Sequence, residues 1–443
     1  MTSLDHIPSK PSSSPAALVA AGGMSAADPA VPEAGSGGHG VTGTTCRLAI
    51  TVTGADRPGV TGSLFAALAA HGVEVLDIDQ AVIRGTLTLG VLVGTTADPD
   101  LVRTDVERSM TALEMTVRVR TADDADSRTG PSHLVIVLGR PLQAATVGTL
   151  AQRFGEIGVN IDAIKRVADY PVTGLELAVS APDDDRLRQV VAAVAAADGV
   201  DIAVERAGLE RRAKRLIVFD VDSTLITGEV IEMLAEHTGA LAEVETITAA
   251  AMRGELDFEA SLRARVRMLA GLDATVLDEV GRSLELTPGA RTTVRTLKRL
   301  GYRCGIVSGG FTQVAKHLVA ELDLDFVAAN TLEVGPDGLL TGDLVGDIVD
   351  RPGKARALAR FAMESGVGMN QTVAVGDGAN DIDMLTAAGL GIAFNAKPVV
   401  AGFADTTLNQ PFLDPVLFML GLTRDEVEAA DAADGSLRRV PLN

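Results

Sequence analysis

The sequence predicts an α/β protein in which two related βαββαβ units precede a larger domain built on a parallel sheet. The chain has 443 residues, which corresponds to roughly three domains at about 150 residues each. Two blocks, beginning near residues 48 and 133, share the same order of strands, turns and helices. From residue 216 onward, short apolar runs alternate with longer helical segments, a pattern that is typical of a parallel sheet.

The composition excludes several classes of function. Acidic residues outnumber basic ones by 59 to 39, giving a formal net charge of −20, whereas nucleic-acid binding requires clustered Lys and Arg. The same balance disfavours an anionic membrane surface, and no run reaches the roughly 18 or more apolar residues of a membrane span. Cys46 and Cys304 are too few for a disulfide framework or a Cys-based zinc site. We therefore expect a cytoplasmic protein without nucleic-acid or membrane partners.

Four segments are predicted to lie outside the domains. Residues 1–44 are rich in Ser, Pro, Ala and Gly and cannot bury enough apolar surface to fold, so we expect a disordered tail. The polar run 121–132 is predicted to link the two blocks, and the basic run 210–215 to be a solvated linker. Residues 426–443 are expected to form a C-terminal tail.

The two blocks align through their turn residues. Pro58 aligns with Pro141, and Gly72 aligns with Gly158. Each block reads as a strand, a Pro/Gly turn, a helix that ends at glycine, and a further strand. This pattern predicts a duplicated βαββαβ unit of the ferredoxin-like type over 45–120 and 133–206.

The DRPG turn of the first block and the strand that begins G-V-N-I in the second resemble ACT domains. ACT domains are small-molecule sensors that often bind amino acids between paired copies. The resemblance implies an amino acid effector such as serine, and a homodimer. Candidate effector contacts are Asp56 and Gly59 in the first block and Gly139 and Asn160 in the second, although each taken singly is better explained as a turn residue.

The third domain is predicted over 216–425. Its apolar strands are LIVF, RCGIVS, FVAAN, TVAVGD and LGIAFN, and a helical insertion covers about 229–287. In an open parallel sheet, ligands bind beyond the carboxyl ends of the strands. The chemically suggestive residues of this domain lie at such ends.

The first strand-end cluster is VFDVDSTLI, where Asp220 directly follows the strand and Asp222 lies two residues further on. Two neighbouring carboxylates repel each other unless a cation lies between them or one is protonated. That arrangement suits a nucleophilic carboxylate paired with a general acid/base. An isolated D-x-D also occurs as a metal ligand or a helix N-cap.

Two further clusters suit a phosphate group. Ser308, Gly309 and Gly310 follow the second strand, where a hydroxyl and exposed backbone N–H groups favour an anion, although a tight turn would use the same residues. Lys354 opens a predicted helix. A lone lysine there is usually at the surface, but a phosphate pocket lined by acids requires an ammonium group.

The fourth cluster is VAVGDGANDIDML. Asp377 ends a strand, and Asn380 and Asp381 follow in the next turn. Oxygen ligands gathered from two strand ends suit Mg²⁺. The alternative is an acidic helix N-cap with no metal.

Taken in order, D-x-D-x-T, S-G-G, the lysine and G-D-G-x-N-D resemble the haloacid dehalogenase superfamily, whose domain is Rossmann-like. The resemblance implies a phosphatase that acts through an aspartyl-phosphate. P-type ATPases share D-x-x-x-T and G-D-G-x-N-D, but they require transmembrane helices, which this sequence does not predict.

The helical insertion supplies candidates for substrate recognition. In FEASLRARVRMLAGL, Arg263 and Arg267 share one helical face, and Arg265 lies nearly opposite them on the apolar side. A buried arginine needs an anionic partner. The partner is either a glutamate, Glu229 or Glu232, or a substrate carboxylate, which the planar guanidinium matches. In the second case Glu229 would receive a substrate ammonium group.

The pattern over about 216–410 is similar to that of the phosphoserine phosphatase family. The resemblance makes Asp220 the nucleophile and Asp222 the general acid/base, with Mg²⁺ held by Asp220, Asp377 and the backbone carbonyl of Asp222 and supported by Asp381. It places Ser308, Gly309, Gly310, Lys354 and Asn380 around the phosphoryl group, and Glu229, Arg265, Met252 and Phe258 around the serine moiety.

The expected function is therefore Mg²⁺-dependent hydrolysis of O-phospho-L-serine to L-serine and phosphate, the last step of serine biosynthesis, under amino acid control. Two alternatives remain. One is transfer of the phosphoryl group to a second hydroxyl, such as that of homoserine. The other is a regulatory binding protein whose function resides in the two ACT domains, although the complete set of catalytic clusters argues against it.

Overall fold

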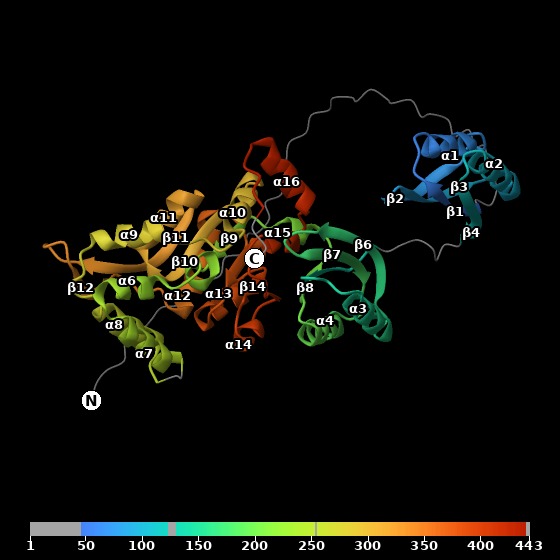
Figure 1. The fold of residues 1–443 in the computed structure, drawn as a ribbon. Helices are drawn as coiled ribbons and strands as arrows, with labels where there is room; N and C mark the ends of the chain where they lie inside the picture. The colour runs from blue at the N-terminus through green and yellow to red at the C-terminus, as the bar shows by residue number, and fades with distance from the viewer. Residues whose placement is uncertain (1–45, 123–129, 253–254, 440–443) are drawn as a thin grey trace, which may run out of the picture. The chain divides into compact units, whose positions relative to one another are not determined.

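The computed structural model describes residues 46–122, 130–252 and 255–439 (Figure 1). The chain divides into two compact units, Met1–Arg128 and Thr129–Asn443, each of which is described by itself. The predicted tail 1–44 lies outside the described residues, as does most of the predicted linker 121–132.

The first unit contains one βαββαβ unit, here called copy 1. Its elements are β1 (Cys46–Ala55), α1 (Val60–Ala69), β2 (Glu74–Ile83), β3 (Thr86–Thr95), α2 (Pro99–Thr111) and β4 (Thr116–Ala122). The strands form an antiparallel sheet in the order β2-β3-β1-β4. Alternate residues of β1 and β3 pack against the apolar stripes of α1 and α2, as the period-two and period-3.6 patterns require.

The second unit begins with copy 2. Its elements are β5 (His133–Gly139), α3 (Ala144–Glu156), β6 (Asn160–Ala168), β7 (Thr173–Ser180), α4 (Asp184–Asp198) and β8 (Asp201–Arg206), and the sheet order is β6-β7-β5-β8. Both faces of β5 are buried. Val135 and Val137 pack with α3 and α4, whereas Ile136 and Leu138 belong to the core of the domain that follows. Copy 2 and that domain therefore share an apolar core.

The junction after copy 2 differs from the prediction. The basic run 210–215 was expected to be solvated, but it overlaps the short helix α5 (Leu209–Arg212). The guanidinium of Arg211 lies 2.8 Å from carboxylate oxygens of both Glu176 and Glu205. Lys214 is buried and donates to the backbone carbonyls of Asn370 and Gly389. Arg211 and Lys214 therefore bind the chain to both of its neighbouring domains, and the prediction of a solvated linker is wrong for these two residues. Arg212 and Arg215, by contrast, are exposed.

The α/β domain has a seven-stranded sheet in the order β12-β11-β10-β9-β13-β14-β15. Its strands are β9 (Leu216–Phe219), β10 (Arg303–Phe311), β11 (Phe326–Val334), β12 (Leu340–Val345), β13 (Thr372–Gly376), β14 (Gly391–Phe394) and β15 (Thr406–Leu408). The strands are parallel except β12, which pairs antiparallel with β11. The central strand β9 is buried on both faces, since Ile217 and Phe219 belong to one apolar cluster and Leu216 and Val218 to another.

Helices cover both faces of this sheet (Figure 1). They are α10 (Ala290–Arg299), α11 (Thr312–Leu322), α12 (Arg351–Glu364), α13 (Ile382–Ala387), α14 (Pro398–Ala401), α15 (Pro415–Met419) and α16 (Arg424–Ala433). The region predicted as an insertion contains α6 (Val230–Thr238), α7 (Leu241–Met252), α8 (Phe258–Arg267) and α9 (Thr275–Ser283). A bridge between Ile226 and Leu286 joins its two ends.

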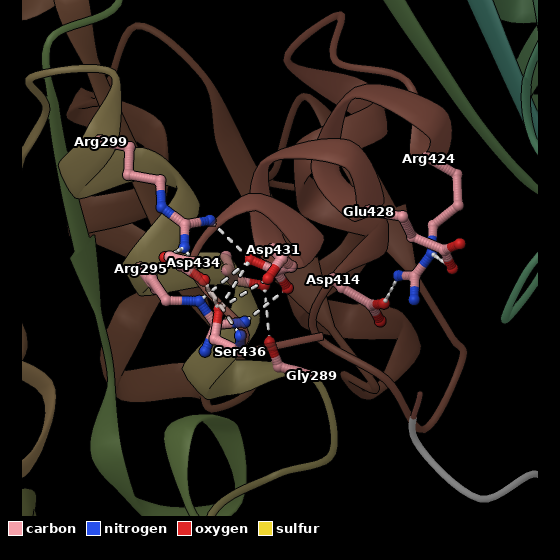
Figure 2. A network of polar contacts seen from close by, with 10 residues as sticks. Gly289, Arg295, Arg299, Asp414, Arg424, Glu428, Asp431, Asp434 and Ser436 are labelled. Atoms are coloured by element: carbon pink, nitrogen blue, oxygen red, sulfur yellow. Dashed lines mark hydrogen bonds and ion pairs between the residues drawn. The ribbon is translucent and has the colours of Figure 1, made fainter. Parts of the chain in front are cut away.

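The five predicted strands of this domain are present, whereas β12 and β15 were not predicted. The predicted C-terminal tail is wrong up to residue 433, because the boundary at 425 falls inside α16. Asp431 of α16 is buried and pairs with Arg295 and Arg299 of α10 (Figure 2). Among the described residues, no helix combines the length and the apolar character that crossing a bilayer requires.

Candidate active site

The carboxyl ends of three adjacent strands bring the predicted catalytic residues together. Asp220 follows β9, Ser308 to Phe311 end β10, and Asp377 follows β13. Because β9 lies between β10 and β13 in the sheet, these three ends meet at one edge. A short irregular turn, Val221–Leu225, follows Asp220, and within it Ser223 adopts a left-handed conformation with φ of 56°.

Lys354 is a fully buried cation between two carboxylates. Its Nζ lies 2.8 Å from Oδ2 of Asp220 and 2.7 Å from Oδ1 of Asp381. Burial alone would lower the pKa of Lys354, but the two carboxylates raise it above its ordinary value. The lysine therefore stays charged, as the prediction of one ammonium group in an acidic pocket requires.

Three carboxylates converge beside this lysine. Oxygen atoms of Asp220, Asp377 and Asp381 lie within 4.8 Å of one another. Burial raises the pKa of Asp377 to about 6. Three acids and a single lysine leave an excess of negative charge in a buried place, which a divalent cation with oxygen ligands would neutralise.

Asp222 is held by the start of the insertion. Its Oδ1 accepts a hydrogen bond of 2.8 Å from the backbone N–H of Val230. Burial, with a further contribution from the nearby carboxylate of Glu229, raises the pKa of Asp222 to about 7. A carboxyl group with such a pKa can both donate and accept a proton near neutral pH.

The C-terminal end of β10 presents backbone groups next to these acids. The N–H of Gly310 donates to Oγ of the buried Ser308 at 2.8 Å, and Asn330 donates to the carbonyl of Gly309. A Cβ at Gly310 would lie 3.2 Å from Oδ2 of Asp222, so a side chain there would crowd the acid. Glycine at this position therefore lets the backbone approach Asp222 closely.

A cavity of about 770 Å³ opens onto this edge of the sheet. The predicted residues that line it are Asp220, Asp222, Glu229, Phe258, Arg265, Gly309, Gly310, Asp377 and Asn380. Ser308, Lys354 and Asp381 are buried next to these residues. Met252 is the last residue of α7, and its side chain lies outside the described residues.

Arg265 and Glu229 bring opposite charges to the same cavity. Within the described part of the chain, Arg265 forms no ion pair, and its Nε has no hydrogen-bond partner. Burial lowers the pKa of Arg265, although Glu229 and Asp222 oppose this shift, and burial raises the pKa of Glu229. Arg265 thus forms no ion pair with Glu229 or Glu232 among the described residues. Its guanidinium is available to an anion in the cavity.

Several residues of the site were not predicted. The Thr224 hydroxyl donates to Oδ1 of Asp377 at 2.8 Å, and the Ser223 hydroxyl donates to Oε1 of Glu229 at 3.0 Å. Both belong to the motif D-V-D-S-T, and their position next to the two aspartates is the sequence feature that could have indicated a role in the site. Arg351, Asn395 and Lys397 also line the cavity, but the sequence analysis had no reason to single them out as site residues.

The predicted effector residues lie at strand ends in both copies. Asp56 follows β1 of copy 1, and Gly59 caps α1 with φ of 96°. In copy 2, Gly139 pairs with Thr173 and Asn160 pairs with Ser180, which are the two ends of β7. Gly139 and Asn160 therefore lie at opposite ends of the sheet and do not form one site within copy 2.

Comparison with known proteins identifies the family. Residues 47–120 and 131–205 each match an ACT domain, and residues 217–386 match a haloacid dehalogenase-like hydrolase. The phosphoserine phosphatase SerB2 of Mycobacterium tuberculosis is 58% identical over 399 residues, which cover 89% of this chain and 97% of that protein. The chain belongs to the phosphoserine phosphatase family.

Other members of the phosphoserine phosphatase family agree with this assignment. The phosphoserine phosphatase of Streptomyces coelicolor is 56% identical over 389 residues, covering 87% of this chain and 94% of that protein. The unliganded structure of a probable phosphoserine phosphatase from Vibrio cholerae matches with a TM-score of 0.52 and 31% identity, covering 69% of this chain and 90% of that one. Copies 1 and 2 are thus ACT domains, the α/β domain is a haloacid dehalogenase-type hydrolase domain, and these predicted resemblances are confirmed.

Proposed function

We propose that this enzyme hydrolyses O-phospho-L-serine to L-serine and inorganic phosphate through an aspartyl-phosphate on Asp220, with Mg²⁺ as its cofactor. One observation carries the proposal. A single cavity contains Asp220 beside the buried cation Lys354, and also contains the oppositely charged pair Arg265 and Glu229. Relatives named phosphoserine phosphatase, at 58% and 56% identity over most of the chain, support the choice of substrate.

The three clustered carboxylates fit a small divalent cation, since all donors are oxygen atoms and their negative charge exceeds that of Lys354. Asp381 already accepts hydrogen bonds from Lys354 and from the N–H of Gly378, so we assign it a supporting role. Asp220, Asp377 and the backbone carbonyl of Asp222 would hold the ion. Bound Mg²⁺ would neutralise part of the charge on the phosphate.

The residues of the chain perform two displacements at phosphorus. A carboxylate oxygen of Asp220 attacks phosphorus, and the bond from phosphorus to the serine oxygen breaks. Asp222 gives its proton to the departing serine oxygen, for which the raised pKa of about 7 suits it. Asp222 then takes a proton from the water that attacks the aspartyl-phosphate, which releases phosphate and restores Asp220.

The remaining residues orient the substrate. Lys354, the Ser308 hydroxyl and the backbone N–H of Gly309 bind the phosphoryl oxygens. Arg265 receives the carboxylate of the serine moiety in a bidentate manner, and Glu229 receives its ammonium group. Phe258 forms an apolar wall of the same cavity.

A phosphate-release assay over a panel of phosphomonoesters tests the proposal. The panel contains O-phospho-L-serine, O-phospho-L-threonine, phosphoethanolamine and glycerol phosphate, each measured with Mg²⁺ and with EDTA. We expect phosphoserine to give the highest kcat/KM by at least tenfold, and EDTA to abolish turnover. A preference for a substrate without the amino acid head group would contradict the roles of Arg265 and Glu229.

The same proposal places the enzyme at the last step of serine biosynthesis and assigns a regulatory role to the ACT domains. We infer that an amino acid, with L-serine as the first candidate, binds to these domains in a homodimer. Because Gly139 and Asn160 lie at opposite ends of copy 2, each would contact a different effector site. A serine titration followed by the change in Tm and in kcat tests this role, and light scattering tests the dimer.

A further inference from the structure

The residues Phe412, Leu413 and Asp414, here called the 412–414 segment, connect β15 to α15 and lie outside the cavity. All three are almost completely buried, with exposed fractions of 3%, 0% and 1%. Most polar groups of a buried loop have specific partners, although Oδ1 of Asp414 has no hydrogen-bond partner among the described residues. The partners of this segment come from two separate parts of the second unit.

One set of contacts leads to copy 2, directly through Arg140 and indirectly through Arg424 of α16. The guanidinium of Arg140, which directly follows β5, lies 5.2 Å from the centre of the Phe412 ring. The guanidinium of Arg424 lies 5.0 Å from the centre of the Tyr170 ring and donates to Oδ2 of Asp414 at 2.7 Å. Figure 2 shows Arg424 reaching both Asp414 and Glu428. One cation–π contact therefore joins the segment directly to copy 2, and a second joins copy 2 to Arg424, which pairs with Asp414 of the segment.

The other partners are the residues Thr287 to Gly289, which lead into α10. The N–H of Leu413 donates to the carbonyl of Pro288 at 2.8 Å. Gly289 has φ of 87°, and a Cβ there would lie only 2.7 Å from the backbone nitrogen of Asp414. The two segments thus fit closely against each other, and a shift of one requires a shift of the other.

Thr287 in turn holds the turn that follows the proposed nucleophile. Its hydroxyl donates to the carbonyl of Thr224 at 2.7 Å, and its N–H donates to the carbonyl of Leu225 at 2.9 Å. Thr224 is fully buried, and its own hydroxyl donates to Asp377. The position of Thr287 therefore sets the position of the turn that follows Asp220 and whose Thr224 hydroxyl binds Asp377.

We propose that Thr287 is a positioning residue of the phosphatase site, and that copy 2 controls its position through the 412–414 segment. This inference depends on the proposed function only for the choice of substrate. The physical basis is a series of hydrogen bonds, an ion pair, a close packing contact and two cation–π contacts. The 412–414 segment, Thr287 and Thr224 are buried, whereas Arg140 is exposed and Tyr170 is half-buried. Because close-packed groups are hardly compressible, a shift of copy 2 would move the 412–414 segment and, through it, Thr287.

Substitutions of Thr287 test the first part. Thr287→Val keeps the shape but removes the hydroxyl, and leaves the Thr224 carbonyl without this donor. We expect kcat for phosphoserine to fall about tenfold while KM changes less than twofold. Thr287→Ser keeps the hydroxyl and should retain kcat within twofold. Equal kcat in the wild type and Thr287→Val, each measured well below its Tm, would overturn the positioning role.

A double-mutant cycle with Tyr170 tests the second part. Tyr170→Leu removes the ring beneath Arg424, whereas Tyr170→Phe keeps the ring and removes only a hydroxyl that has no hydrogen-bond partner among the described residues. We expect Tyr170→Leu to lower kcat about threefold and Tyr170→Phe to match the wild type. Added to Thr287→Val, Tyr170→Leu should cause little further loss, because both act on one connection.

Two outcomes contradict control by copy 2. One is an unchanged kcat in Tyr170→Leu, and the other is a double variant whose losses multiply as for independent sites. If Tyr170→Leu does not fold, Arg140→Gln replaces it in the cycle, since Arg140 is exposed and contacts the same segment. If the wild type releases no phosphate from phosphoserine, the proposed function fails, and the cycle is then measured with p-nitrophenyl phosphate.

Discussion

Lys354 and Asp220 form an ion pair of 2.8 Å in which neither side chain is more than 5% exposed. The lysine comes from the first turn of α12 and the aspartate from the end of β9, so two elements far apart in the sequence place opposite charges in one buried position. A second carboxylate, Asp381, lies 2.7 Å from the same ammonium group. Removal of the lysine would remove the ion-pair partner of both carboxylates.

Lys354→Ala is expected to lower kcat for phosphoserine at least 100-fold, because the phosphoryl group loses its fixed positive partner. The variant should also lose about 3 kcal/mol of unfolding free energy in EDTA, since two buried charges lose their partner. Lys316→Ala is the control, because Lys316 is 59% exposed and lies on α11. Near-normal kcat in Lys354→Ala would contradict the role of the ion pair.

Arg265→Met is expected to raise KM for phosphoserine at least tenfold, because the substrate carboxylate loses a bidentate partner. KM for phosphoethanolamine, which has no carboxylate, should change less than twofold. Arg263→Met is the matched control on the same helix, since Arg263 pairs with Glu259 at the surface. If both substrates lose affinity equally, Arg265 acts on the fold of the insertion and not on the carboxylate.

Asp414 predicts a dependence of stability on pH. Burial raises the pKa of Asp414 to about 6 from an unfolded value of 3.8. The folded protein therefore binds this proton more tightly, so the contribution of Asp414 to stability is largest at low pH and falls as the pH rises through about 6. Relative to the wild type, Asp414→Asn should lose about 1 kcal/mol more unfolding free energy at pH 5 than at pH 8. Denaturant unfolding at both pH values measures this, and a difference that does not vary with pH would contradict it.

Arg211 predicts that the junction stabilises the second unit. Arg211→Ala is expected to cost about 3 kcal/mol of unfolding free energy, because Glu176 and the buried Glu205 both lose their partner. Arg212→Ala is the matched control, since Arg212 is the next residue and is exposed. Equal unfolding free energies in the two variants would show that the junction contributes little.

The strands and the strand-end motifs were predictable because they depend on local patterns. An apolar run such as LIVF and a turn such as V-F-D-V-D-S-T carry their signal within a few residues, and the carboxyl ends of parallel strands meet at one edge. The positions of Asp220 and Asp377 follow from that rule alone. Asp381 was expected only to support the metal, yet its carboxylate lies within the acidic cluster.

Other features depend on contacts between distant segments, for which one sequence carries no signal. Arg211 pairs with carboxylates on β7 and β8, and the basic run itself does not indicate these partners. The short strand β15 has three residues and forms only by pairing with β14. The separation of Gly139 from Asn160 follows from strand register, and the link from Thr287 to Thr224 joins residues 63 positions apart.

In the proposed mechanism, Asp220 carries the phosphoryl group during turnover. The most direct test of this step is acid quenching of the wild type and Asp220→Asn during reaction with ³²P-labelled phosphoserine in the presence of Mg²⁺. We expect labelled wild-type protein with the label on the peptide that contains Asp220, and no label and no turnover in a folded Asp220→Asn variant. Phosphate release by Asp220→Asn, or label on another residue, would contradict it.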